Sequence, residues 1–107
     1  MSKPLNRVIN GFDSNLSTRV ITNDPEYTPK GEYILVTMDS PEVIINLDSS
    51  VNDHLIIKAL CPTKIVPDLQ KIDRLYDDIL IDNGASIELC FIFNTWYVVS
   101  SDGVKLG

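Results

Sequence analysis

Short apolar runs separated by turn residues make up most of the chain beyond residue 31. The runs 32–38 (EYILVTM), 42–47 (EVIINL) and 54–60 (HLIIKAL) are rich in β-branched side chains, and DSP and DSSVND segments separate them. Short β-rich runs bounded by Asp, Ser, Asn and Pro are typical of strands joined by turns. The pattern therefore predicts an all-β domain.

The segment 78–100 predicts a meander of three antiparallel strands. Asn83-Gly84 lies between two apolar runs, and this dipeptide supplies the two positive φ angles of a type I′ hairpin turn. Asn94-Thr95 then interrupts the run before it resumes as WYVVSS. We expect a tight turn at each of these two places.

Residues 86–93 alternate between two faces of the expected strand. One face is apolar throughout, as in a strand that covers a core, and the other face is also partly apolar. A sheet that is apolar on both faces must be covered on both, and small β domains often meet this need by self-association. The candidates for the core or for an interface between copies are Ile87, Leu89, Phe91, Phe93, Trp96 and Val98.

The segment 67–80 has a different pattern. Its apolar residues recur at helical spacing behind Pro67, which suits the first turn of a helix. These apolar residues are Leu69, Ile72, Leu75, Tyr76 and Ile79. A short helix is one interpretation, and an irregular strand followed by a loop is the other.

The first thirty residues differ in composition from the rest. They hold three of the six prolines and many Asn, Ser and Thr residues, which predicts an extended arm at 1–30 before a β domain at 31–107. Apolar residues are dotted through the arm, and such a segment usually needs a surface on which to dock. The docking candidates are Val8, Ile9, Phe12, Val20 and Ile21. We find no internal repeat of solenoid length.

Length and charge limit the class of protein. The 107 residues amount to one domain, and 15 acidic against 9 basic side chains leave a net charge of −6, which argues against binding to nucleic acid. No apolar run approaches the roughly 18 residues needed to span a bilayer, and the first residues lack the apolar segment of a signal peptide. We expect a soluble protein that is made in the cytoplasm and does not bind membranes.

No residue pattern points to catalysis. His54 is the only histidine, and it lies beside Asp53 and seven residues before Cys61. A Cys hydrolase built on Cys61 and His54 is the least favoured alternative, because His54 is equally explained as a histidine at the edge of a strand. Cys61 and Cys90 lie in apolar surroundings and are expected to be buried free thiols. Without a P-loop, a GxGxxG motif or a metal-binding Cys/His cluster, we expect no enzyme activity and no cofactor.

Five aspartates form the densest carboxylate group. Oxygen-rich clusters bind Ca²⁺, but the spacing lacks the D-x-D-x-D-G order and the closing Glu of an EF-hand loop. The group consists of Asp68, Asp73, Asp77, Asp78 and Asp82. We interpret it as a solvated acidic loop and assign no metal ligands.

Four segments of the chain carry a resemblance to a known family. They are YILVTMDSPEVIINLD, DHLIIKAL, KID and ASIELCFIFNTWYVVS, in this order. Residues 33–100 resemble a module of tailed-bacteriophage virion proteins that include head fibres, capsid decoration proteins and tail-fibre segments. The chain departs from the family where Asp53 or His54 replaces the glycine before the IK strand, where Arg74 follows Ile-Asp, and in a shorter closing hairpin.

The resemblance implies a small antiparallel β-sandwich or β-prism-like domain that assembles as a homotrimer. In such a protein the N-terminal arm attaches the trimer to the virion, so the expected partners are other copies of the chain and the major capsid protein. The expected function is that of a capsid decoration (cement) or head-fibre protein. The alternative is a receptor-binding tail-fibre or tip module, in which aromatic side chains such as Tyr27, Tyr33 or Tyr76 stack on host sugars. If the resemblance holds, 67–80 is an irregular strand and loop.

Overall fold

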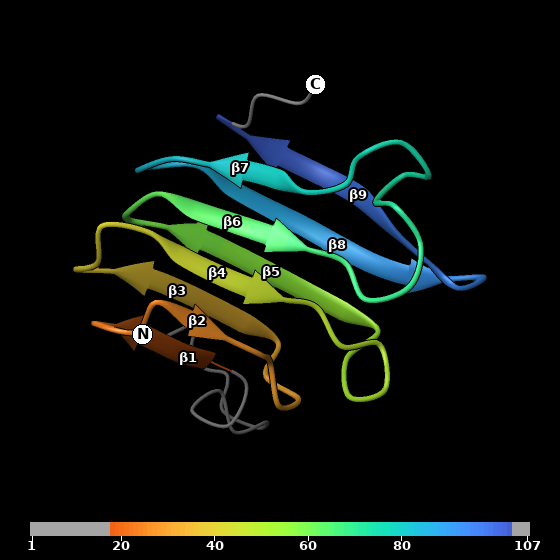
Figure 1. Cartoon of the computed structure of the whole chain (residues 1–107), viewed down its shortest axis with the longest axis horizontal. Coiled ribbons are helices and arrows are strands. Elements are labelled where there is room, and N and C mark those ends of the chain that lie inside the picture. Colours follow the sequence, from red (N-terminus) through yellow and green to blue (C-terminus); the bar gives the residue numbers. More distant parts are fainter. Residues whose placement is uncertain (1–17, 104–107) are drawn as a thin grey trace, which may run out of the picture.

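The computed structural model describes residues 18–103, which form two β-sheets and contain no helix (Figure 1). The all-β prediction is therefore confirmed, and no helix capable of crossing a membrane occurs in this range. The five-stranded sheet contains β1 (Thr18–Thr22), β3 (Ile34–Met38), β5 (His54–Ala59), β8 (Ser86–Ile92) and β9 (Thr95–Asp102), in this spatial order. The four-stranded sheet contains β2 (Glu26–Tyr27), β4 (Val43–Asn46), β6 (Thr63–Val66) and β7 (Ile79–Ile81).

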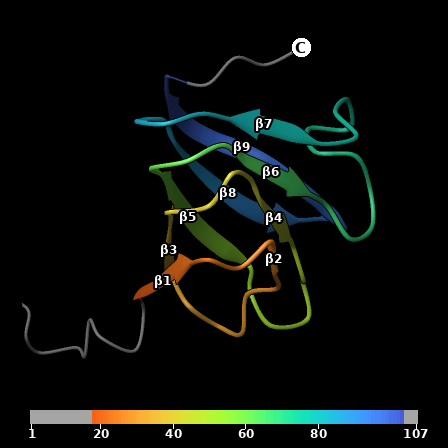
Figure 2. The same cartoon turned by 60° about the vertical axis from the view of Figure 1, so that its left-hand side comes forward.

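The chain alternates between the two sheets and forms three successive coils. Each coil places one strand in the five-stranded sheet and the next strand in the four-stranded sheet, so β1, β3 and β5 lie parallel and so do β2, β4 and β6. Thr18 pairs with Ile34, which pairs with Ile56. Figure 2 shows the two sheets as separate layers.

The expectation of a wholly antiparallel domain is wrong for these coils. Antiparallel pairing occurs only toward the end of the chain, between β5 and β8, β6 and β7, and β8 and β9. A parallel pair needs a long crossover, and here a strand of the opposite sheet provides it in place of a helix. The coils also form a structural repeat that the sequence does not show, because the turns that connect the strands differ in length and composition.

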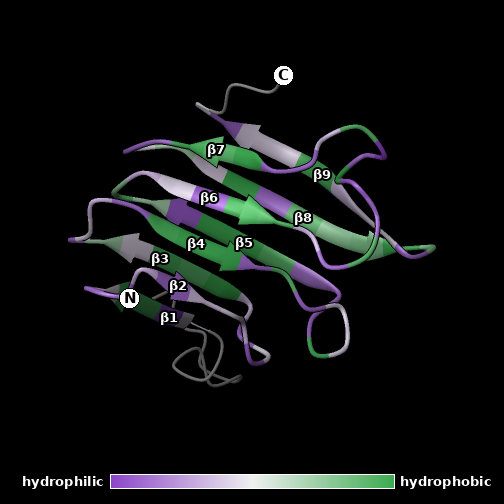
Figure 3. Ribbon diagram, in the orientation of Figure 1, coloured by the Kyte–Doolittle hydropathy of each residue, from purple (hydrophilic) through white to green (hydrophobic). Residues whose placement is uncertain are grey.

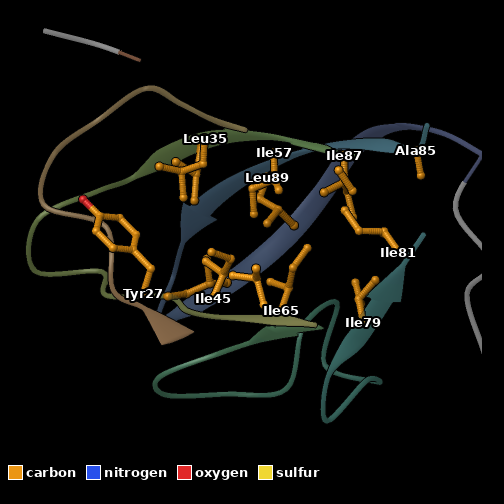
Figure 4. Close-up of a cluster of buried hydrophobic side chains, with 14 of the residues drawn as sticks. Tyr27, Leu35, Ile45, Ile57, Ile65, Ile79, Ile81, Ala85, Ile87 and Leu89 are labelled. Carbon is orange, nitrogen blue, oxygen red and sulfur yellow. The ribbon is translucent and has the colours of Figure 1, made fainter. Parts of the chain in front are cut away.

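One face of every strand points into a core between the sheets. Leu35, Ile57 and Leu89 of the five-stranded sheet face Ile45 and Ile65 of the four-stranded sheet, and all five are completely buried (Figure 4). The burial patterns of β3 to β6 alternate strictly, as expected where one sheet face packs inward. Apolar residues accordingly lie along the strands, while polar residues occupy most of the turns (Figure 3).

The tight turns differ from the predicted ones. Asn83-Gly84 joins β7 to β8, which belong to different sheets, and of the two only Gly84 has a positive φ (93°). Ala85 N–H donates to the Asp82 carbonyl oxygen at 2.9 Å, so this is a turn of type II form and not a type I′ hairpin. The two-residue hairpin lies between β8 and β9, where Phe93 and Asn94 have φ of 54° and 63°.

The segment before β7 is a loop, so the helical interpretation of 67–80 is wrong. An isolated bridge joins Ile72 to Tyr76, and Ile72 is fully buried. Asp73 N–H donates to the Trp96 carbonyl oxygen at 2.8 Å. The helical spacing of apolar residues is thus coincidental, since Leu69 and Leu75 are exposed and only the bridge end of the loop contributes to the core.

The N-terminal boundary also needs correction. Residues 18–30 do not belong to an arm, because β1 and β2 extend the two sheets and begin the first coil. Ile21 and Tyr27 are core residues with exposed fractions of 1% and 8%. The rest of the predicted arm lies outside the described residues, and with it the docking candidates Val8, Ile9 and Phe12.

Candidate interaction surface

The five-stranded sheet turns an apolar face away from the core, which we call the outer face. Cross-strand neighbours continue this face from strand to strand: Val20 pairs with Val36, Ile34 with Ile56, and Cys90 with Tyr97. Their alternation with core residues places them outward. The apolar members of the outer face are Val20, Ile34, Val36, Met38, Ile56, Cys90, Ile92 and Tyr97.

A polar cluster lies across the same face. His54 Nε2 is 2.6 Å from Glu88 Oε2, and the Ser100 hydroxyl donates to Glu88 Oε1 at 3.2 Å. The Tyr33 ring stacks on the His54 imidazole with centroids 4.8 Å apart. Because Ser100 contacts Glu88 and not His54, the cluster lacks the contact between nucleophile and base that nucleophilic catalysis requires. Its geometry suits a fixed polar element within an apolar surface.

The predicted core or interface residues divide into three groups. Ile87, Leu89 and Trp96 are buried, with exposed fractions of 1% or less. Phe91 and Val98 are partly buried and pack against the same core. Phe93 lies in the hairpin turn and is 83% exposed, because the strand ends before it and its side chain leaves the alternating pattern.

Two of the predicted docking candidates, Val20 and Ile21, lie within the described residues, and they differ in exposure. Val20 is 51% exposed on β1, whereas the Ile21 side chain is buried in the core and does not form a free docking surface. Of the tyrosines considered for stacking on sugars, Tyr27 is buried, and Tyr33 is engaged by His54. No specific observation favours the sugar-binding alternative.

Tyr27, on β2 of the first coil, lies at one end of the core (Figure 4). Its hydroxyl donates to the Glu32 carboxylate, while Arg19 and Lys30 lie over its ring at 5.4 and 5.2 Å from the centroid. Burial, together with the hydrogen bond to Glu32 and the charge of that carboxylate, raises the pKa of Tyr27 to about 12. Tyr27 therefore stays protonated. Its buried ring packs at the end of the core while its hydroxyl is hydrogen-bonded.

The structure separates the pair that a Cys hydrolase would need. His54 begins β5 on the outer face, whereas Cys61 follows the end of β5 and is buried. A strand of this length holds the two residues roughly 20 Å apart. The hydrolase hypothesis is wrong for this pair. Both cysteines are free, and Cys90 is only partly buried on the outer face.

Two of the five aspartates hold the loop 67–78 against β9. Asp68 Oδ1 accepts a hydrogen bond from the Trp96 indole at 3.1 Å, and Asp73 Oδ1 accepts one from Val98 N–H at 3.0 Å. Burial opposes the ionisation of Asp68, but hydrogen bonds from Ser49 and Trp96 outweigh it and lower its pKa.

Ion pairs involve two further aspartates. Asp77 pairs with Lys71 at 3.5 Å and Asp78 with Lys64 at 3.9 Å. Within residues 18–103 no three metal-binding side chains come together.

The chain matches no known family model, and no curated protein sequence is significantly similar to it. The assignment of the outer face as an interaction surface therefore depends on its geometry alone. The sequence could have indicated the apolar residues of β3 and β5 on this face, because the runs EYILVTM and HLIIKAL are apolar at nearly every position. Only residues 86–93 were interpreted as two-sided.

Proposed function

We propose that the chain is a structural protein of a tailed-phage virion, a capsid decoration or head-fibre protein that assembles as a homotrimer. The observation that carries the proposal is the apolar outer face of the five-stranded sheet. The resemblance of residues 33–100 to virion modules supplies the phage context and the threefold symmetry.

The outer face favours association between copies for a physical reason. Ile34, Val36 and Ile56 form an apolar block near its centre and are only partly buried, with Lys58 opposite Val36 and Glu88 opposite Ile56. Burial of such side chains releases about 25 cal/mol for each Å² of apolar surface removed from water. The His54–Glu88 pair adds polar groups that would orient the copies within the interface. His54 Nδ1 is buried without a hydrogen-bond partner.

The proposed mechanism is adhesion. Three chains in one particle present three N-terminal segments, and binding of the first segment raises the effective concentration of the other two at the capsid. The attachment segment is narrowed to residues 1–17, because deletion up to residue 22 would remove β1 and the buried Ile21.

Two lysine substitutions test the trimer interface. Ile56→Lys places a charge at the centre of the outer face and should reduce the trimer to a monomer. Ile44→Lys is the matched control, because Ile44 is also partly buried and lies on the outward side of the four-stranded sheet, between Glu26 and Lys64. Light scattering after size exclusion measures the mass, and circular dichroism checks that both variants fold. Equal masses for the two variants would contradict the assignment of the interface.

Attachment to the virion needs a separate test. Particles assembled from the phage genome that encodes the chain, with this gene disrupted, are mixed with purified full-length protein or with protein lacking residues 2–17. Cosedimentation of the full-length protein alone is the expected result. Binding of both proteins would remove the attachment role of the N-terminal segment. Binding of neither, or absence of the chain from wild-type particles, would contradict a virion function.

A further inference from the structure

The outward edge of β1 is unprotected. β1 ends the five-stranded sheet and pairs on one side only, with β3. Its sequence, TRVIT, contains four β-branched residues, no proline and no glycine, and a single charge at Arg19. Within residues 18–103 no backbone hydrogen bond is made to this outward edge. A flat edge of this composition is a template for another strand.

The other sheet edges of the described range are protected. β2 and β7 have only two and three residues, which is too short for a stable added strand. The edge of β9 is covered where Asp73 bonds to Trp96 and Val98, and a register shift opposite Glu88 and Leu89 bends the remainder. Among the described sheet edges, that of β1 is therefore the one available to pair with another strand.

We propose that the β1 edges of two copies pair antiparallel about a twofold axis that passes beside Val20. In this register Val20 faces Val20 of the second copy, and Thr18 faces Thr22. Arg19 faces Ile21, so no like charges stand opposite each other. Val–Val and Thr–Thr cross-strand pairs are favourable, and the strand is therefore complementary to itself.

The pairing also extends the outer face. Val20 belongs to that face and is 51% exposed, so two paired copies bring two outer faces into one continuous sheet. This inference goes beyond the proposed function and does not depend on it. If the homotrimer is correct, the twofold contacts join two trimers into a closed pair.

The test is a charge swap at Val20. Val20→Lys and Val20→Glu each place like charges opposite each other across the twofold axis, and an equimolar mixture restores an attractive pair. Val99→Lys is the control, because Val99 is 55% exposed on β9 at the opposite end of the same sheet. The readout is the light-scattering mass of the full-length chain, relative to its 12.0 kDa, at several concentrations.

We expect each Val20 variant to have half the wild-type mass, the mixture to regain the full mass, and Val99→Lys to leave it unchanged. Failure of the trimer alone would appear as a wild-type dimer that Val20→Lys converts to a monomer, while Ile56→Lys has no effect. A wild-type mass that Val20→Lys does not halve, or a mixture that stays at half mass, would overturn the pairing.

Discussion

The Asp73 carboxylate accepts a hydrogen bond from the backbone N–H of Val98 at 3.0 Å, while the Asp73 N–H donates to the Trp96 carbonyl oxygen at 2.8 Å. One residue of an irregular loop thus takes the place of a neighbouring strand along two residues of β9. The loop covers a sheet edge that would otherwise expose unpaired backbone groups.

Asp73→Ala should destabilise the protein by about 1–2 kcal/mol, because Val98 N–H loses an acceptor that carries a charge. The residue has a φ of 56°, a conformation in which alanine is also strained. Asp73→Asn is the control, since asparagine tolerates this φ and keeps a carbonyl acceptor. Urea unfolding gives the free energies, and an equal loss for both variants would contradict the edge-capping role.

The stability of the fold should fall with acid partly through Asp68. Its pKa is lower in the folded protein than the ordinary 3.8, so its contribution is complete above that value and is lost as the pH falls through the lowered one. Asp68→Asn should therefore flatten the decline of stability below about pH 5. Trp96 is the only tryptophan and donates to Asp68, so its fluorescence reports the change directly. An unaltered acid profile in the variant would show that other carboxylates dominate.

A pair of buried threonines links the two sheets. The Thr63 hydroxyl donates to the Cys61 carbonyl oxygen at 3.0 Å, so Thr37 must be the donor in the 2.6 Å contact between Thr37 and Thr63. Thr63→Val should cost about 1–3 kcal/mol, because it leaves the Thr37 hydroxyl buried without an acceptor. Thr37→Val should cost less, and the double variant should be more stable than Thr63→Val alone. A larger loss for Thr37→Val than for Thr63→Val in urea unfolding would disprove this direction of hydrogen bonding.

Phe93 should be replaceable with a gain in stability. It occupies the first position of the β8–β9 hairpin turn with a φ of 54° and is 83% exposed, so an aromatic side chain has strain there and little packing to offset it. Phe93→Asn should stabilise the protein by about 0.5–1 kcal/mol, measured at concentrations where the oligomer is absent. A loss of stability in Phe93→Asn would contradict this account of strain at Phe93.

The strands were predictable where β-branched runs were long, and the topology was not. EYILVTM, EVIINL and HLIIKAL mark β3, β4 and β5 because apolar side chains fill both faces of a strand. The strand at Thr63–Val66 was missed because prolines flank it closely. Pairing direction depends on which sheet each strand enters, and short turns are compatible with either a hairpin or a crossing to the opposite sheet.

The candidate surface was predictable only in part. The two-sided apolar character of residues 86–93 was visible in the sequence, whereas the joining of Ile34, Val36 and Ile56 into one block required the parallel register. Val20 was predicted as a docking residue and is exposed, but its buried neighbour Ile21 was assigned the same role. Alternation within a five-residue strand turns these two side chains to opposite faces once β1 is recognised.

The measurement that tests the central claim most directly is the solution mass of the wild-type and Ile56→Lys proteins, by light scattering over a range of concentrations. Assembly through the outer face predicts a wild-type mass that is a multiple of three chains of 12.0 kDa, and a variant that loses this factor of three while keeping its circular dichroism spectrum. A wild-type protein that stays a 12.0 kDa monomer at every concentration would contradict it.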